Sequence, residues 1–227
     1  MRLDYLNGTQ YNIYQPEGMY HCNSDTELLG RFMRIRQRES LLDIGTNNGA
    51  LLLYGAAYHP LSMTGIDLYA EVLEVARKNL SMHGLQAELI ETRVQDFKGK
   101  MFHVIVCNPP YFSTAKKDLI NTNPYIAAAR HESFLSLPDL FASVKRLLKS
   151  NGRFYLVHRA SRMNQIMQLA FSHGFVTRIL QIAYETEGGK GKSALFCFQY
   201  GNTSELIIKP PVYLDDRDSF DRLEGMV

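Results

Sequence analysis

From residue 41 onward the chain alternates short apolar runs with amphipathic stretches of helical periodicity, and this alternation restricts its possible folds more than any other feature. A buried parallel strand is typically a continuous apolar run, and the helix that crosses back over the sheet has one apolar side. The pattern therefore predicts an α/β fold with a mostly parallel sheet and helices on both faces. The expected strands are 41–44, 63–67, 87–90, 104–107 and 154–157, and the expected helices are 49–58, 70–82, 137–149 and 162–173.

The first 40 residues have a different pattern. Apolar and polar residues alternate in 3–14 on both sides of Asn7-Gly8, and both turn residues tolerate positive φ, so we expect a small hairpin. The segment from Ser24 to Glu27 is typical of a capping box, in which these two residues satisfy each other's backbone amides. It predicts a helix that continues to about Arg36.

Near the C-terminus, two further apolar runs at 175–184 and 193–200 flank the glycine-rich segment 187–192. This arrangement predicts an antiparallel hairpin at the end of the sheet. No repeat or low-complexity linker divides the chain. We therefore expect one catalytic domain over 41–227, with the hairpin and helix of 1–40 appended to it.

Composition limits the classes of partner. With 45% apolar residues in a chain of 227, a full hydrophobic core is expected. The 25 Lys and Arg against 23 Asp and Glu give a net charge of +2, so nucleic acid would have to meet local basic clusters. Cys22, Cys107 and Cys197 have neither disulfide-framework nor zinc-ligand spacing, which favours reduced thiols. The absence of a signal sequence and of a long apolar run predicts a cytoplasmic protein without a membrane partner.

In an open α/β sheet, ligands lie beyond the carboxyl ends of the strands, so the residues that follow each strand are informative. The first such segment is Asp43-Ile44-Gly45-Thr46-Asn47-Asn48-Gly49, a glycine-containing turn. A dinucleotide-binding turn needs glycine at position 47, where the backbone approaches a pyrophosphate. Asn47 therefore favours a nucleoside ligand without phosphates, whose charged tail meets free amides at the helix start.

Two acidic residues follow the next strands. Asp67 lies about 20 residues beyond the glycine turn, where such folds place an acceptor for both ribose hydroxyls. A helix N-cap is the alternative interpretation of Asp67. Asp96 could accept a hydrogen bond from an adenine amino group, although an isolated residue of this type is more often part of a turn.

The fourth strand end is the most informative, because the apolar run 104–107 leads directly into Asn108-Pro109-Pro110-Tyr111. Proline removes backbone donors and fixes φ, so this segment presents carbonyl groups and the Asn108 amide in a rigid arrangement rich in acceptors. A planar amine with two N–H groups fits such an arrangement, and Tyr111 can lie against the ring that carries the amine. A simple proline turn would explain the prolines but not the two residues that flank them.

With these motifs, the chain resembles the class I S-adenosylmethionine-dependent methyltransferases that carry an Asn-Pro-Pro-Tyr motif and methylate amines. Within that group it is most similar to the bacterial tRNA adenine-N6 methyltransferases that act on position 37 of a valine tRNA. Asn47 stands where glycine is commoner in the family. The matching segments are 23–29, 43–49, 108–111, 129–132, 192–195 and 207–211.

The resemblance implies a Rossmann-like sheet of seven strands, S-adenosylmethionine as cofactor, and methylation of the exocyclic amine of an adenine in tRNA. In this class of enzyme, Asn108 and the Pro109 carbonyl hold the two amino hydrogens, and no strong general base is needed. Catalytic roles fall to Asn108, Pro109, Pro110 and Tyr111. Cofactor contacts are expected from Asp25, Thr26, Asp43, Gly45, Thr46, Asn47, Gly49, Asp67, Leu68, Asp96, Phe97 and Asn108.

Contacts with the RNA substrate are expected from basic residues in loops near the catalytic edge. Tyr111 would hold a splayed adenine. His131 has no second ligand at metal spacing, so we expect a salt bridge in the substrate loop and no metal site. The expected substrate-binding residues are Tyr111, Lys116, Lys117, Arg130, His131, Lys190 and Lys192. We expect a monomer or weak dimer.

Three other functions remain open. A protein glutamine N5-methyltransferase could use the same acceptors, because a side-chain amide is also a planar amine. We do not expect it, because the segment 1–40 before the cofactor turn does not have the pattern of a helical substrate domain. An rRNA guanine-N2 methyltransferase is a further enzymatic alternative. A nonenzymatic nucleotide-sensing module would leave the segment 108–111 without a purpose.

Overall fold

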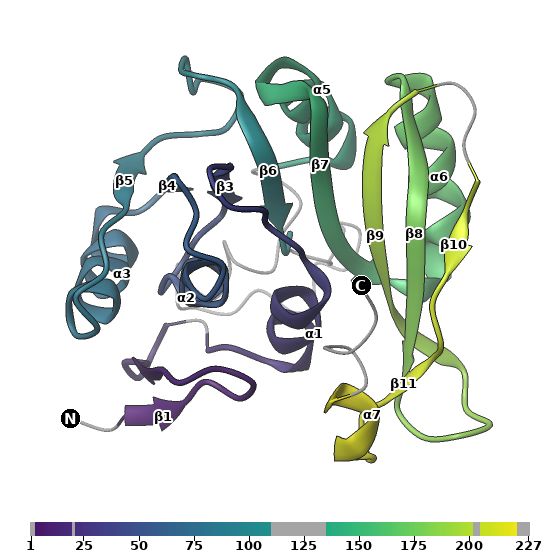
Figure 1. Ribbon diagram of the computed structural model, residues 1–227, viewed down its shortest axis with the longest axis horizontal. Helices are drawn as coiled ribbons and strands as arrows, with labels where there is room; N and C mark the ends of the chain where they lie inside the picture. Colours follow the sequence, from purple (N-terminus) through teal and green to yellow (C-terminus); the bar gives the residue numbers. More distant parts are fainter. Residues whose placement is uncertain (1–2, 20, 110–134, 202–204, 222–227) are drawn as a thin grey trace.

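The computed structural model describes residues 3–19, 21–109, 135–201 and 205–221, and these form an α/β fold around one central sheet (Figure 1). The strands lie in the order β10-β8-β9-β7-β6-β3-β4-β5, and β11 also pairs with β8. All pairs among β3 to β7 are parallel, so the expected α/β class is confirmed. The strands are β3 (Ser40–Ile44), β4 (Ser62–Asp67), β5 (Glu88–Glu91), β6 (Phe102–Cys107), β7 (Leu148–Arg159), β8 (Phe175–Tyr184), β9 (Gly191–Tyr200), β10 (Ile207–Ile208) and β11 (Val212–Tyr213).

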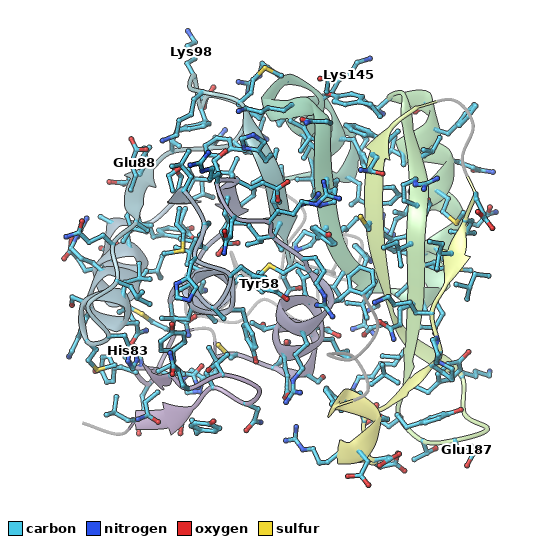
Figure 2. All side chains as sticks on the ribbon, viewed as in Figure 1. Tyr58, His83, Glu88, Lys98, Lys145 and Glu187 are labelled. Carbon is cyan, nitrogen blue, oxygen red and sulfur yellow. The ribbon has the colours of Figure 1, made fainter. Side chains whose placement is uncertain are left out.

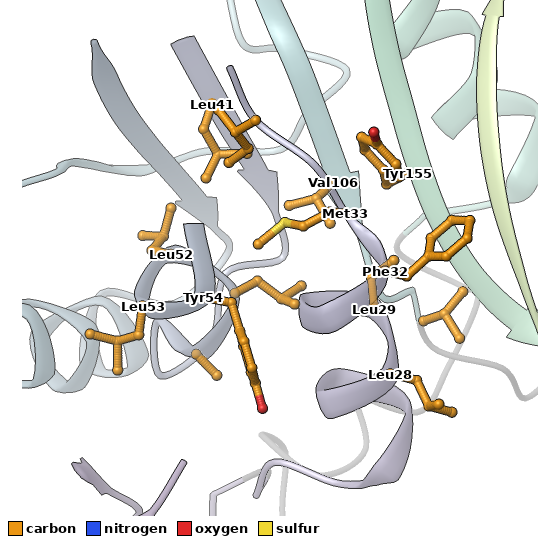
Figure 3. Packing of buried hydrophobic residues seen from close by; sticks show 14 of the residues in the cluster. Leu28, Leu29, Phe32, Met33, Leu41, Leu52, Leu53, Tyr54, Val106 and Tyr155 are labelled. Carbon is orange, nitrogen blue, oxygen red and sulfur yellow. The ribbon is translucent and has the colours of Figure 1, made fainter. Parts of the chain in front are cut away.

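Helices cover both faces of the sheet. Along the central strands, neighbouring residues such as Leu41 and Leu42 belong to different buried clusters, because successive side chains point to opposite faces. Helices α1 (Ser24–Phe32), α2 (Ala50–Ala56) and α3 (Ala70–Ser81) contribute to the first cluster, part of which is drawn in Figure 3. Helices α5 (Leu137–Leu147) and α6 (Met163–Ser172) contribute to the second.

The C-terminal part of the sheet is larger than expected. The predicted hairpin is present, with β9 antiparallel to both β7 and β8. The two short strands β10 and β11 extend the sheet to nine strands instead of the expected seven, and both pair in parallel with β8. Each has two residues, which is too short to form a recognisable alternating pattern. The short helix α7 (Arg217–Asp221) follows them.

The N-terminal hairpin is confirmed. Strands β1 (Leu3–Tyr5) and β2 (Asn12–Tyr14) pair antiparallel, and Gly8 supplies the positive φ of the turn at +74°. A side chain of α3 attaches the hairpin to that helix: Asn79 accepts a hydrogen bond from the Tyr14 amide at 2.8 Å and donates one to the Tyr14 carbonyl at 3.0 Å. The hairpin thus lies against the helices of the first face.

The cap of α1 differs from the expected capping box. The N-cap is Asn23, whose side chain accepts from the Thr26 amide, whereas Glu27 uses its carboxylate for Arg31 and Arg217. Asn and Ser are both favoured at the N-cap, where their side chains accept from the free amides of the first turn. Because α1 begins one residue earlier than expected, Asn23 takes this role instead of Ser24.

Helix α1 also ends earlier than expected, at Phe32 instead of Arg36. The guanidinium of Arg34 donates hydrogen bonds to the carbonyls of Arg31 and Met33, so it satisfies acceptors that a longer helix would have used internally. Met33 itself is extended, with ψ of 151°. The chain therefore turns directly from α1 towards β3.

The appended segment shares its core with the sheet. Leu6 and Ile13 of the hairpin belong to the same buried cluster as Leu28 and Leu29 of α1 and Leu41 of β3. The last three are labelled in Figure 3. A division at residue 40 stays a prediction. In the described ranges, no helix combines the length and apolar character needed to cross a membrane.

Candidate active site

The carboxyl ends of three central strands lie level with one another. Ile44, the last residue of β3, is paired with Ile66 of β4 on one side and with Cys107 of β6 on the other. Gly45, Asp67 and Asn108 each follow one of these paired residues, so the three predicted motifs meet at one edge of the sheet. The strand register therefore brings the glycine turn, Asp67 and the Asn-Pro segment together at this edge, as expected.

The glycine turn keeps its shape although it has one glycine fewer than a dinucleotide turn. Positive φ occurs at Gly45, Asn47 and Gly49, at +72°, +49° and +81°. Asn tolerates the left-handed region better than most residues, which explains why Asn47 can occupy the middle position.

Most amides of the turn itself bond within the protein, and the expected contact of a charged tail with the amides at the start of α2 stays a prediction. The Gly45 and Thr46 amides donate to the Ile66 carbonyl, the Asn47 amide to Asp67, and the Gly49 amide to the Thr46 carbonyl. Four amides are therefore already satisfied within the protein.

Asp43 is a buried acid directly before this turn. It is fully shielded from solvent, and its Oδ2 accepts a hydrogen bond from the Thr46 hydroxyl at 2.7 Å. Burial raises the pKa of Asp43 to about 7; the Thr46 bond opposes this rise, and the negative charge of Asp67 adds to it. Its other oxygen, Oδ1, has no hydrogen-bond partner among the described residues. The same holds for Oδ1 of Asn47. The turn therefore contains two buried acceptors suited to a ligand that donates hydrogen bonds.

Asp67 is held by backbone amides. Its Oδ2 accepts from the Asn47 amide at 2.9 Å and its Oδ1 from the Leu68 amide at 2.7 Å. Burial raises its pKa against the effect of these bonds. The N-cap of α3 is Tyr69, so the alternative interpretation of Asp67 as an N-cap is not what the structure has. The two amides fix the orientation of the carboxylate and use part of its accepting capacity.

The Asn-Pro segment faces α1. Asn108 is half-buried at the end of β6, and its Nδ2 donates a hydrogen bond to the Thr26 hydroxyl at 3.2 Å. Pro109 is buried, and Pro110 and Tyr111 lie outside the described residues. The first turn of α1 therefore lies across the end of the strand that carries the predicted catalytic residue.

Asp25 connects the same turn of α1 to the far hairpin. Its Oδ1 accepts a hydrogen bond of 2.5 Å from the hydroxyl of Ser193 in β9, and both side chains are buried. One oxygen of this expected cofactor ligand is thus used within the protein. The first turn of α1 bridges β6 and β9.

Comparisons with known proteins agree with this geometry. The family model "Methyltransferase small domain" matches residues 11–179. The chain belongs to this family. It is 28% identical over 200 residues to a tRNA1(Val) (adenine(37)-N6)-methyltransferase of Phocaeicola vulgatus, covering 86% of this chain and 84% of that protein. A protein of the same name from Vibrio vulnificus is 31% identical over 171 residues, covering 73% and 70%.

A solved structure has a similar fold. The ribosomal protein L11 methylase from Lactobacillus delbrueckii subsp. bulgaricus superposes with a TM-score of 0.63 at 16% identity, over 89% of this chain and 100% of that one. At that identity the likeness concerns the fold alone. The protein is an S-adenosylmethionine-dependent methyltransferase, and its sheet is Rossmann-like.

Two expected cofactor residues of this methyltransferase follow β5, the strand that pairs with β4. Asp96 is exposed in a turn, and Phe97 is buried against Phe102 in the cluster on the α5 face. The guanidinium of Arg146, from α5, donates hydrogen bonds to the carbonyls of Val94 and Phe97 and so fixes the path of this segment. Contacts from Asp96 and Phe97 to a cofactor stay predictions.

The loop 185–190 between β8 and β9, called the basic loop below, lies at the edge of the sheet where the central strands end, and it contains both acidic and basic residues. It follows β8, which runs parallel to the central strands, and Figure 2 labels Glu187 within it. Lys190 is exposed, whereas Lys192 forms an ion pair with Glu185 at 2.8 Å. The other expected substrate residues, namely Tyr111, Lys116, Lys117, Arg130 and His131, lie outside the described residues. No group of three potential metal ligands occurs within the described part of the chain.

Three residues that position the methyltransferase site were missed in the sequence. Asn23 caps α1, Ser193 holds Asp25, and Asn79 donates from its Nδ2 to the Asn48 carbonyl of the cofactor turn at 2.9 Å. Asn79 is fully buried, so its amide links the turn to the N-terminal hairpin away from solvent. Asn23 had a local signal, as an N-cap type residue before an apolar stretch. The other two act on partners far away in the sequence and have no such signal.

Proposed function

We propose that this protein transfers a methyl group from S-adenosylmethionine to the exocyclic N6 of an adenine in tRNA. The observation that carries the proposal is the position of Asn108 and Pro109, at the end of β6 and one strand away from the glycine turn. An acceptor-rich segment beside a nucleoside site is what the methylation of a planar amine requires.

The residues of the turn fit the cofactor by charge and by hydrogen bonding. S-adenosylmethionine carries a sulfonium and an ammonium group. The acids Asp43 and Asp67 lie at the carboxyl ends of the neighbouring strands β3 and β4. The buried acceptors of Asp43 and Asn47 that lack partners in the described ranges suit an ammonium or hydroxyl donor. We infer that Asp43, Asn47 and Asp67 hold the cofactor, with Gly45 and Gly49 supplying the backbone conformation around it.

The chain's own residues supply alignment and acceptors. S-adenosylmethionine, when bound, supplies a methyl group that is already activated for transfer. The side-chain oxygen of Asn108 and the Pro109 carbonyl each accept one hydrogen of the substrate amine, which directs its nitrogen lone pair towards the cofactor. As the nitrogen becomes positive, both acceptors stabilise the charge. The surplus proton on the methylated nitrogen then passes to solvent water, so no strong general base is needed. Tyr111 would hold the plane of the adenine ring.

The nature of the substrate rests on the relatives. Two proteins covered over at least 70% of their length bear the name tRNA1(Val) (adenine(37)-N6)-methyltransferase, which supports a tRNA adenine as the acceptor here. Cytoplasmic localisation and a monomer or weak dimer stay predictions. The lysines of the loop after β8 would contact phosphates of the RNA.

The test offers several acceptors in parallel. The purified protein receives S-adenosylmethionine with a labelled methyl group and either unmodified tRNA, an rRNA fragment or a protein release factor. We expect label in N6-methyladenosine from tRNA, and mapping of the tRNA fragment gives the nucleotide. An Asn108→Ala protein serves as the matched control. Label in N2-methylguanosine or in a glutamine side chain would replace the proposed substrate. Cofactor binding without transfer to any acceptor would contradict the proposed activity.

A further inference from the structure

Three hydrogen bonds connect the cap of α1 to the side-chain amide of Asn108. The Thr26 amide and the Thr26 hydroxyl both donate to Oδ1 of Asn23, at 3.1 and 3.3 Å, and Asn108 Nδ2 donates to the Thr26 hydroxyl at 3.2 Å. We propose that Thr26 is a positioning residue, which fixes the orientation of the Asn108 amide through this chain of bonds. The inference rests on the proposed function, because it explains how Asn108 presents its oxygen to an amine.

The donor and acceptor roles in these three hydrogen bonds are fixed first at the cap of α1. A backbone N–H can only donate, so the atom of Asn23 that faces the Thr26 amide must be its carbonyl oxygen. This requirement removes the usual ambiguity between the oxygen and nitrogen of an Asn side chain. The capping residue of α1 therefore has a defined orientation.

The orientation of Asn23 in turn determines the role of the Thr26 hydroxyl towards Asn108. It has one hydrogen, and donating that hydrogen to Asn23 leaves only lone pairs towards Asn108. Asn108 must then offer its NH2 group to Thr26, so its carbonyl oxygen points to the other side of the amide. Thr26 thereby selects one of the two flipped states of Asn108.

This selection matters for methyl transfer. With its oxygen outward, Asn108 accepts a hydrogen from the substrate amine; in the flipped state its own NH2 would face the substrate NH2, and no hydrogen bond could form between two donors. Preorganised acceptors contribute to the rate because they need not reorganise during the reaction. Thr26 thus affects the chemical step without touching either reactant.

The first turn of α1 is held firmly enough for this task. Asp25, one residue earlier, is bound by Ser193 of β9 at 2.5 Å. Glu27, one residue later, pairs with Arg217 of α7 at 3.1 Å and with Arg31 at 3.1 Å. Gly30 allows close packing of α1, since a Cβ there would lie 2.3 Å from the ring of Tyr54. Thr26 is itself buried, so water does not compete for its hydroxyl.

The proposal differs in its consequences from the expected contact between Thr26 and the cofactor. A cofactor ligand contributes to the dissociation constant of S-adenosylmethionine, whereas a residue that orients Asn108 contributes to kcat. Thr26→Val replaces the hydroxyl by a methyl group of similar size, and Thr26→Ser keeps the hydroxyl. Thr177→Val, near the start of β8 and so away from the carboxyl ends of the central strands, is a matched control for the substitution itself.

The experiment measures kcat and KM on tRNA, the affinity for S-adenosylmethionine by calorimetry, and the Asn108 side-chain NH2 signals in a 1H–15N spectrum, assigned by their loss in Asn108→Ala. For Thr26→Val we expect kcat to fall about 10- to 100-fold while cofactor affinity stays within about twofold. The Asn108 signals should shift in Thr26→Val and stay near their wild-type positions in Thr26→Ser, which should also keep most of kcat. Thr177→Val should match the wild type throughout.

Other outcomes would overturn the proposal. These are an unchanged kcat in Thr26→Val, a loss of cofactor affinity equal to the loss of kcat/KM, or a Thr26→Ser protein as impaired as Thr26→Val. Unshifted Asn108 signals in Thr26→Val would also contradict it. A wild-type protein that methylates no tRNA adenine would refute the proposed function instead, and the NMR comparison would still test the bond to Asn108.

Discussion

The two halves of the active site are held together in different ways. The cofactor turn combines two kinds of bond. Asp43 is bound by Thr46, three residues away, and Asp67 by the amide next to it, while the Asn47 amide and the Asn79 side chain add bonds that span 20 and 31 residues. The Asn108 half depends on Thr26, 82 residues away, and through Asp25 on Ser193, 168 residues from its partner. The first half therefore needs the adjacent segments β3, β4 and α3, whereas the second half exists only when α1, β6 and β9 are assembled together.

The sharpest test of this contrast is the removal of the catalytic amide. We expect Asn108→Ala to lower the rate of methyl transfer by about 100- to 1,000-fold, since it removes an acceptor that stabilises developing charge. Cofactor affinity should change little, because the turn on β3 does not depend on Asn108. Single-turnover rates and calorimetry measure the two quantities. An Asn108→Ala enzyme with wild-type activity would contradict the role of Asn108 as an acceptor for the substrate amine.

A change in the charge of Asp43 should affect the affinity for S-adenosylmethionine and not the rate of methyl transfer. Burial raises the pKa of Asp43 to about 7, so the carboxyl is mostly protonated at pH 6 and mostly ionised at pH 8. Because the cofactor carries two cationic groups, its affinity should rise between these pH values. Asp43→Asn should bind about tenfold more weakly at pH 8 and lose this pH dependence.

The same shift predicts a change in stability of opposite sign. A folded pKa above the unfolded value gives stability that is present at low pH and lost as pH rises through about 7. Asp43→Asn, which has no charge to bury, should therefore gain stability relative to the wild type at pH 8 compared with pH 6. Glu74→Gln, at an exposed position of α3, is the control. Parallel pH profiles for wild type and Asp43→Asn would contradict the buried charge.

The bridge between α1 and β9 should have a smaller effect on activity and a measurable one on stability. Ser193→Ala leaves the buried Asp25 without its donor, which we expect to cost about 1–3 kcal/mol in free energy of unfolding. Urea denaturation measures it, with Ser172→Ala on the exposed side of α6 as the matched control. A loss equal to that of the control would show that Asp25 finds another partner.

The smallest effect is expected from the basic loop. If Lys190 contacts one phosphate, Lys190→Gln should weaken tRNA binding modestly and lower the slope of log K against log salt by about 0.7–0.9. Lys192→Gln should change the slope less, because Glu185 already neutralises this lysine. Filter binding across a salt series measures both. A slope unchanged by Lys190→Gln would exclude a phosphate contact there.

The sequence predicted the parts of the fold that repeat a pattern. Each expected strand and helix from residue 41 onward that lies in the described residues is present, because buried runs and amphipathic periodicity are local consequences of packing. Most bounds agree within a few positions, but β7 begins at Leu148, six residues before the expected 154 and inside the expected helix 137–149. The cap of α1 was displaced to Asn23, and β10, β11 and α7 were missed since each is too short to carry a period. In the site, Asp43 and Asp67 lie at the carboxyl ends of β3 and β4 and Asn108 directly follows β6, where function concentrates in such sheets.

The amino-acid sequence by itself determined the α/β class, the acid-flanked turn and the Asn-Pro segment, since each depends on residues a few positions apart. Only the tertiary structure decided that Asn79 fastens the turn to Tyr14, that Ser193 holds Asp25 and that Thr26 meets Asn108. Those contacts join segments whose separation along the chain carries no periodic signal. They form because folding brings together polar groups that must each find a partner once water is excluded.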